Sequence, residues 1–178
     1  MSIILGIDPG SRITGYGVIE MRQSRLYYVG CGCIKTVPDD LFPNKMKQIY
    51  DGVAELISQF HPAAFAIEKA FVSKSIDSAF KLCHARASAM MAGLNAGLFI
   101  GEYTPRMVKE SVAGYGNAPK EQVQEMVIRL LHLSGAPQAD AADALAIAIC
   151  HGNTSLGLRG FNFGTAAVIA GTSHSRIK

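Results

Sequence analysis

Hydrophobic and polar positions along the chain predict an antiparallel sheet at its start. Three stretches rich in apolar and β-branched residues come first, at residues 3–7, 14–20 and 26–36. A polar segment, Arg22–Arg25, separates the second stretch from the third by the length of a hairpin turn. The N-terminal part of the chain is therefore expected to form three paired strands.

The pattern changes to a helical period after the third stretch. Between Phe42 and Phe60 apolar residues recur at every third or fourth position, which predicts a helix that Pro62 brings to an end. Strands and helices then alternate. The expected elements are a strand at 64–67, an alanine-rich helix capped by Ser75 or Asp77 and running to about Gly97, a strand at 98–103, helices opened by Pro105 and Pro119, and a last helix from Ala139 to His151.

This order of elements favours an α/β fold in which helices cover both faces of a mixed sheet. The chain has 178 residues, of which 49% are hydrophobic and 17% charged, and this is enough to build the core of one domain. We expect that domain to span residues 1–151. Residues 152–178, which are rich in Gly, Ser and Thr and contain no acidic residue, are expected to form a flexible tail.

The sequence carries no sign of a membrane or an oxidising compartment. No apolar stretch reaches the roughly 20 residues that span a bilayer, and the N-terminus lacks the basic start of a signal peptide. The four cysteines include no Cys-x-x-Cys pair, so we expect reduced, structural thiols. Cys31 and Cys33 would share one face of a strand, where a redox role is the alternative. We therefore expect a cytoplasmic protein that makes no membrane contact.

The net charge of +3 is too small by itself to indicate a nucleic-acid partner, but its distribution is uneven. Between Lys69 and Lys120, seven basic residues stand against three acidic ones, a local excess of four positive charges. The positive potential is therefore concentrated in the middle of the chain.

Four acidic residues lie inside apolar runs at widely separated points of the sequence: Asp8, Glu68, Asp140 and Asp143. An ionised carboxylate removed from water without a partner loses several kcal/mol or more of solvation, so four of them in core-like surroundings imply a shared cation. Asp8 and Glu68 each end an expected strand, whereas Asp140 and Asp143 are three positions apart and share one face of a helix. Two strand ends and one helical face can converge on a single site.

Carboxylate oxygens are the ligands that hard divalent ions such as Mg²⁺ prefer. Four carboxylates suffice to hold two ions about 3.5 to 4 Å apart, the arrangement that catalyses in-line displacement at phosphorus. The pattern therefore suggests phosphodiester hydrolysis.

Each acid also has a structural interpretation. Asp8 fits the first position of a turn with the Pro-Gly that follows it, and Glu68 fits an ion pair with a nearby lysine. Asp140 fits a first-turn acid, which the helix dipole favours whatever the function. Asp143 resists such an explanation, because its neighbours form a largely apolar helix.

Four blocks of the sequence, in this order, resemble the RuvC family of bacterial Holliday junction resolvases. They are residues 8–17 (Asp-Pro-Gly-Ser-Arg-Ile-Thr-Gly-Tyr-Gly), 65–68 (Phe-Ala-Ile-Glu) followed by Phe71, 106–124 with its lysines and Gly-x-Gly, and 137–148 with both aspartates. The resemblance covers Ser2 to His151. Departures include Cys83 and Ala87 in place of family glycines, and Ser75-Ile76-Asp77 where an asparagine is common.

The resemblance implies a ribonuclease-H-like fold, with a mixed five-stranded sheet flanked by helices on both faces, and a homodimer. It implies paired symmetric nicking of four-way junction DNA in homologous recombination and DNA repair, with RuvA and RuvB as branch-migration partners. Asp8, Glu68, Asp140 and Asp143 match the family's catalytic, metal-binding tetrad. The implied cofactor is two Mg²⁺ ions per subunit, with Mn²⁺ as a possible substitute.

Basic and aromatic residues complete the site that the resemblance implies. Lys109 and Lys120 align with lysines that the family uses near the scissile phosphate, where a positive charge offsets developing negative charge. Phe71 matches a phenylalanine that stacks on an unpaired base. Further DNA contacts are expected from Lys69, Lys74, Arg86 and Arg106. For Lys45 and Lys47, by contrast, we expect ordinary solvated positions on the surface.

Three other classes of protein share parts of this pattern. A sugar-kinase or actin-like ATPase also begins with a strand ending in Asp-x-Gly, but it needs two such domains. A non-catalytic junction-binding protein would tolerate loss of one of the four acids, and all four are present. A ribonuclease acting on RNA–DNA hybrids would share the metal site, so only the flanking blocks favour junction DNA.

Overall fold

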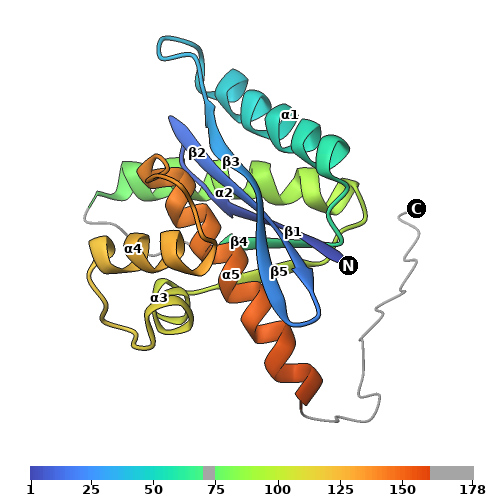
Figure 1. The fold of residues 1–178 in the computed structure, drawn as a ribbon. Coiled ribbons are helices and arrows are strands. Elements are labelled where there is room, and N and C mark those ends of the chain that lie inside the picture. The colour runs from blue at the N-terminus through green and yellow to red at the C-terminus, as the bar shows by residue number, and fades with distance from the viewer. Residues whose placement is uncertain (70–74, 161–178) are drawn as a thin grey trace.

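A computed structural model describes residues 1–69 and 75–160 of the chain (Figure 1). Phe71 and Lys74, both expected to contact DNA, and the part of the expected tail from residue 161 onward lie outside the described residues. The described part contains β1 (Ser2–Asp8), β2 (Ile13–Arg22), β3 (Arg25–Lys35), α1 (Phe42–Phe60), β4 (Ala64–Glu68), α2 (Ile76–Asn95), β5 (Ile100–Tyr103), α3 (Pro105–Ala113), α4 (Lys120–Leu130) and α5 (Ala139–Gly160).

The strands form one mixed sheet in the order β3-β2-β1-β4-β5. β1, β2 and β3 pair antiparallel, as the hairpin pattern predicts, whereas β4 and β5 run parallel to β1. A parallel neighbour requires a crossover, and α1 and α2 supply the two crossovers. The expected α/β fold with a mixed five-stranded sheet is confirmed.

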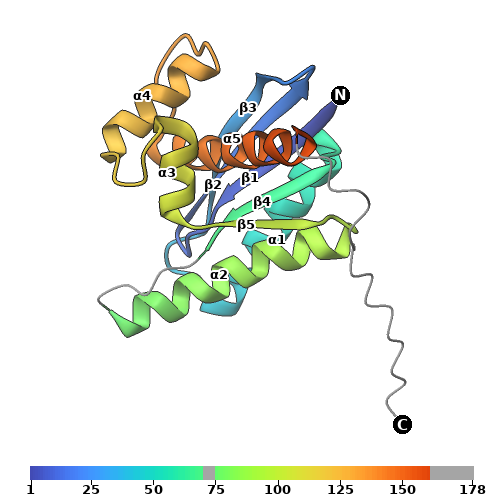
Figure 2. The same cartoon turned by 90° about the horizontal axis from the view of Figure 1, so that it is seen from below.

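Helices cover both faces of the sheet, α1 and α2 on one and α3, α4 and α5 on the other (Figure 2). The side chains of β1 alternate between the two layers because successive residues of a strand point to opposite faces. Ile4 belongs to the core beneath α5, and Leu5 and Ile7 belong to the core beneath α1 and α2. Both cores are therefore anchored on the central strand that ends at Asp8.

The helix α5 lies unusually close to the sheet, because glycines face it. A Cβ on Gly15 would lie 2.0 Å from the carbonyl oxygen of Asp140, and one on Gly17 would lie 2.6 Å from the amide nitrogen of Leu145. On β1, a Cβ on Gly6 would lie 2.3 Å from the carbonyl oxygen of Ala144. This contact, here called the glycine seam (Gly6, Gly15 and Gly17), fixes the start of α5 beside the end of β1.

The observed elements follow the predicted ones, and α1 has the predicted bounds. The clearest difference is α5, which continues beyond His151 to Gly160, so the first nine residues of the expected tail are helical. Tertiary contacts outweigh the weak helix propensity of this stretch. The Asn153 amide donates to the backbone oxygen and the hydroxyl of Ser111, and Leu156 packs against the core. Among the helices of the described residues, none has the length and apolar character needed to cross a membrane.

Candidate active site

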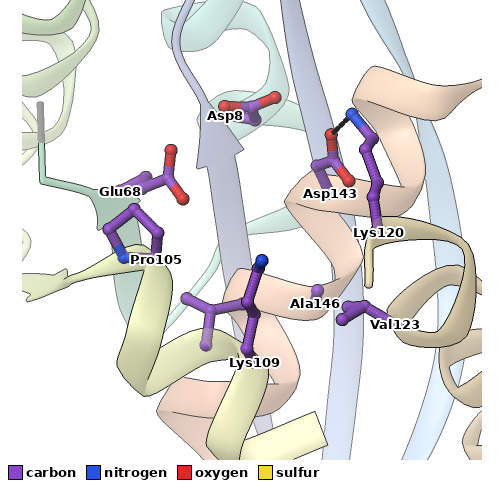
Figure 3. A pocket seen from close by; sticks show the side chains of 9 residues that line it. Asp8, Glu68, Pro105, Lys109, Lys120, Val123, Asp143 and Ala146 are labelled. Atoms are coloured by element: carbon purple, nitrogen blue, oxygen red, sulfur yellow. Dashed lines mark hydrogen bonds and ion pairs between the residues drawn. The ribbon is translucent and has the colours of Figure 1, made fainter. Parts of the chain in front are cut away.

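Three of the four candidate acids line one hollow at the end of the parallel strands. Asp8 ends β1 and Glu68 ends β4, and these strands are paired in register up to Ile7 and Ile67. Asp143 reaches the hollow from the second turn of α5. The hollow has a volume of about 250 Å³ and is lined by Asp8, Glu68, Pro105, Val108, Lys109, Lys120, Val123, Asp143 and Ala146. Figure 3 shows the polar side chains directed into the same space.

Asp140 does not line this hollow, although it lies on the same helix. It occupies the first turn of α5, where the helix dipole favours an acid, and its backbone packs on Gly15 of β2. Its charge nevertheless contributes to raising the pKa of Asp8. The structure therefore brings all four acids into one electrostatic environment, with Asp140 at its margin.

The electrostatic state of Asp8 is the most unusual feature of the site. Burial, followed by repulsion from Glu68, Asp143 and Asp140, raises the pKa of Asp8 to about 7. The pKa of Glu68 is also raised, mainly by burial and then by Asp143. Both carboxyl groups are thus held where their ionised forms are disfavoured. A positive charge placed among them would remove this penalty.

Two lysines supply part of that positive charge. The Lys120 ammonium lies 2.5 Å from the carboxylate of Asp143, a contact drawn in Figure 3. Lys109 points into the hollow from α3, and both lysines act to lower the pKa of Glu68. The pair between Lys120 and Asp143 is partly exposed, and the pKa of Asp8 stays raised although Lys120 acts to lower it. The lysines therefore neutralise the acids only in part.

The donor set fits hard divalent ions, because it consists of carboxylates whose ionised forms need compensation. Within the described residues, however, no three acidic, histidine or cysteine side chains form a ready-made metal cluster. One reason is that the Asp143 carboxylate accepts a hydrogen bond from Lys120 and is directed toward that lysine. Asp8, Glu68 and Asp143 in the hollow, with Asp140 at its margin, are the residues that could hold such ions.

The other basic residues predicted from sequence lie outside the hollow. Arg86 is half-buried on α2, where its Nε donates to the backbone oxygen of Glu68 at 2.9 Å and its guanidinium pairs with Glu102. It therefore holds the strand end that carries Glu68. Lys69 is exposed beyond β4, and Arg106 is exposed at the start of α3, beside Gly116.

Sequence reasoning missed the apolar wall of the hollow, which Val108, Val123 and Ala146 provide. Val108 directly precedes Lys109, and Val123 lies one helical turn after Lys120. A helical projection would have placed Val123 beside Lys120, because residues three positions apart share a helix face, but it would not have paired Val108 with the adjacent Lys109. The wall reduces the access of water to the acids and contributes to their raised pKa values.

Comparisons with known proteins agree with one another. Residues 4–151 match the model of the family described as crossover junction endodeoxyribonuclease RuvC. The crossover junction endodeoxyribonuclease RuvC of Tolumonas auensis is 54% identical over 178 residues, with full coverage of both chains. That of Vibrio cholerae is 57% identical over 155 residues, which cover 87% of this chain and 89% of the relative.

The fold resembles that of a solved relative. The structure described as T. thermophilus RuvC in complex with Holliday junction substrate matches with a TM-score of 0.83 and 32% sequence identity. The match covers 88% of this chain and 97% of the other.

Proposed function

Because the chain belongs to the RuvC family of crossover junction endodeoxyribonucleases, we propose that it resolves Holliday junctions by paired symmetric nicks. The reaction is hydrolysis of phosphodiester bonds in DNA, in the service of homologous recombination and repair. The observation that carries this proposal is the convergence of Asp8, Glu68 and Asp143 with Lys109 and Lys120 in one hollow. The related structure that carries a Holliday junction substrate has nearly the same fold.

The proposed roles follow from the charges of the site. Asp8, Glu68, Asp140 and Asp143 would hold two Mg²⁺ ions, or Mn²⁺ in their place, whose chemistry is to activate a water and to stabilise the leaving oxygen. The carboxylates set this arrangement and do not attack phosphorus themselves. Lys109 and Lys120 would offset negative charge that develops on the phosphate. Their positive charge also admits a polyanion to an acidic site.

We also propose that the protein acts as a homodimer through α2. This helix exposes a stripe of large apolar side chains, namely Ile76, Phe80, Met91 and Leu94, which are between 49% and 74% exposed. Their spacing places them along one side of the helix. A four-way junction has approximate two-fold symmetry, which a symmetric dimer would match. Phe80→Asp is expected to yield a monomer in analytical ultracentrifugation and to abolish paired nicking.

Family membership supports three further parts of the proposal. RuvA and RuvB would deliver the junction, the protein would act on DNA in the cytoplasm, and Phe71 would stack on an unpaired base at the junction centre. Lys69, Lys74, Arg86 and Arg106 stay candidate DNA contacts. Arg86 is already engaged, because its guanidinium contacts the backbone oxygen of Glu68 and the carboxylate of Glu102.

The decisive experiment compares three substrates with and without Mg²⁺: a mobile four-way junction, a linear duplex of the same sequence, and an RNA–DNA hybrid. We expect symmetric nicks in the junction alone, and only with the metal present. Cleavage of the hybrid would retain the metal site but assign the protein to the ribonucleases. Binding of the junction without any metal-dependent cleavage would contradict the enzymatic proposal.

A further inference from the structure

A second hollow region lies on the other side of the turn that follows Asp8. Arg12, on the turn between β1 and β2, lines two adjoining hollows, and Lys45 of α1 lines both as well. One of these hollows also includes Lys81 from the first turns of α2, and the other includes Lys35 at the end of β3. The two hollows are thus parts of one surface, here called the basic groove (Arg12, Lys35, Lys45 and Lys81).

The charge of the basic groove is positive. Its four cations are accompanied by two acids, Asp39 and Asp77. Lys81 pairs with Asp77 across one helical turn in an exposed contact, which is worth little in free energy. Arg12 and Lys35 form no ion pair with any side chain of the described residues. The groove therefore offers uncompensated positive charge to a ligand.

The turn that carries Arg12 is held firmly in place. The buried Thr14 hydroxyl donates to the carbonyl oxygen of Gly10 at 2.8 Å, and the buried Thr36 hydroxyl donates to that of Ser11 at 3.1 Å. The Thr36 amide donates to the carbonyl oxygen of Arg12 at 3.1 Å. A Cβ on Gly10 would lie 2.2 Å from the carbonyl oxygen of Ile13, so the turn is also tightly closed. The backbone of Arg12 consequently keeps a fixed position relative to Asp8.

We propose that the basic groove binds the phosphate backbone of a junction arm that leaves the active site. The inference rests on the proposed function, because it assigns a path to the DNA that this function requires. Asp8 and Arg12 are four residues apart, so their Cα atoms are separated by at most ~14 Å. That span corresponds to roughly four nucleotides of one strand. The groove thus lies within reach of the same arm that presents its scissile phosphate.

Charge and shape favour a nucleic-acid backbone over other partners. Arg12 and Lys45 line both hollows, whereas Lys81 lines one and Lys35 the other, so the cations extend over two adjoining hollows and are not gathered at one point. A chain of phosphates with regular spacing fits such a distribution better than a single anion does. A backbone contact of this kind positions DNA without reading its sequence.

Lys47 provides a matched control for Lys45 and Lys81. It lies two residues after Lys45 on α1, lines neither hollow, and pairs with Asp51 across one helical turn. This pair resembles the one between Lys81 and Asp77 in length and exposure. Lys47→Gln therefore removes the same charge outside the groove.

The test measures junction binding in EDTA by fluorescence anisotropy at several salt concentrations. We expect the Arg12→Gln/Lys45→Gln/Lys81→Gln variant to lower the slope of log K against log salt concentration by about 2 to 3. Lys47→Gln is expected to leave the slope unchanged, and Arg12→Lys is expected to restore most of what Arg12→Gln loses. Circular dichroism of each variant checks that the fold is retained.

A modified substrate locates the contact. Neutral methylphosphonate linkages at about two to four nucleotides from the cleavage position are expected to weaken binding by the parent protein and to have little effect on the triple variant. If the parent nicks junctions but the triple variant keeps its salt slope, the groove inference fails and the proposed function stands. If the parent does not nick junctions while the triple variant loses its slope, the proposed function fails and the groove remains a nucleic-acid site.

Discussion

The acidic hollow (Asp8, Glu68 and Asp143 with Lys109 and Lys120) and the basic groove adjoin the same turn but are built in opposite ways. The hollow places carboxylates at strand ends and on a packed helix, where burial raises the pKa of Asp8 to about 7. The groove instead presents cations near the surface, since Arg12, Lys35 and Lys81 are exposed and Lys45 is partly exposed. Chemistry at phosphorus requires charges that water does not screen, whereas holding a polyanion requires charges that remain accessible.

The comparison predicts opposite consequences of removing a charge. In the hollow, loss of a carboxylate removes a proposed metal ligand and relieves repulsion, so we expect activity to fall while the metal-free protein gains stability. In the groove, loss of a cation weakens DNA binding and has little effect on stability, because exposed ion pairs contribute little. Four experiments sharpen or break this contrast.

The largest effect is expected from Asp8→Asn. The change removes one oxygen charge from the hollow, and we expect the nicking rate in Mg²⁺ to fall by at least about 10³-fold while junction affinity stays within a few-fold of the parent. Asp51→Asn, on the exposed surface of α1, should retain full activity. Single-turnover cleavage of a labelled junction, with anisotropy for binding, measures both quantities. Undiminished nicking by the Asp8→Asn variant would remove Asp8 from the catalytic set.

A smaller effect is expected from Lys120→Gln. The ammonium lies 2.5 Å from Asp143 and is partly exposed, so its loss should lower the nicking rate by about 10- to 100-fold. Arg129→Gln is the matched control, since Arg129 lies on the same helix and, within the part of the chain that the structure describes, pairs with the exposed Glu125. Equal rates for the two variants would show that Lys120 is an ordinary surface lysine.

The raised pKa of Asp8 predicts how stability depends on pH. The folded-state pKa of about 7 lies above the usual 3.8, so the folded protein binds more protons between these values, and stability falls as the pH rises through this range. Without divalent metal, the free energy of unfolding of Asp8→Asn at pH 8 should therefore exceed that of the parent by up to about 4 kcal/mol, and the variant should unfold at a higher temperature. At pH 4 the two proteins should unfold at nearly the same temperature.

Calorimetry at the two pH values, with and without Mg²⁺, measures this difference. Added Mg²⁺ should stabilise the parent at pH 8 more than it stabilises the variant, because its positive charge offsets the ionised Asp8 carboxylate, which the variant lacks. A parent that is more stable than the variant at pH 8 in EDTA would contradict the direction of the pKa shift.

The smallest effect is expected from Thr36→Val, which acts on the turn between the two regions. It removes the buried hydroxyl that donates to Ser11 at nearly constant volume, and should cost about 1 kcal/mol. That cost corresponds to a fall of about 2–4 °C in melting temperature. Junction affinity should fall a few-fold through Arg12. Thr154→Val, which removes a hydroxyl bonded within α5, should not change affinity.

The acidic hollow could be predicted from sequence because charged residues in apolar runs are costly and therefore informative. Asp8, Glu68 and Asp143 stand out by this criterion, and the structure brings them together. Asp140 is less distinctive, and its place at the margin of the site agrees with its fit to a helix start.

The basic groove could not be predicted in the same way. Its cations come from four separate elements, and an exposed lysine or arginine looks alike in sequence wherever it lies. Lys45 and Lys47 were both expected to be ordinary surface residues, yet only Lys45 lines the groove. Arg86 shows the reverse case, because a residue counted among the DNA contacts is engaged by Glu68 and Glu102. Such distinctions depend on tertiary packing.

The glycine seam also has a consequence for how the protein is made. Asp8 and Asp140 are separated by 132 positions, and the glycine seam holds α5 close against β1 and β2. At a synthesis rate of about 5–20 residues per second, the strand that carries Asp8 exists for several seconds before α5 leaves the ribosome. A nascent chain therefore carries an incomplete set of the four acids throughout that time, and, if they act together as proposed, it cannot cut DNA before α5 has been made.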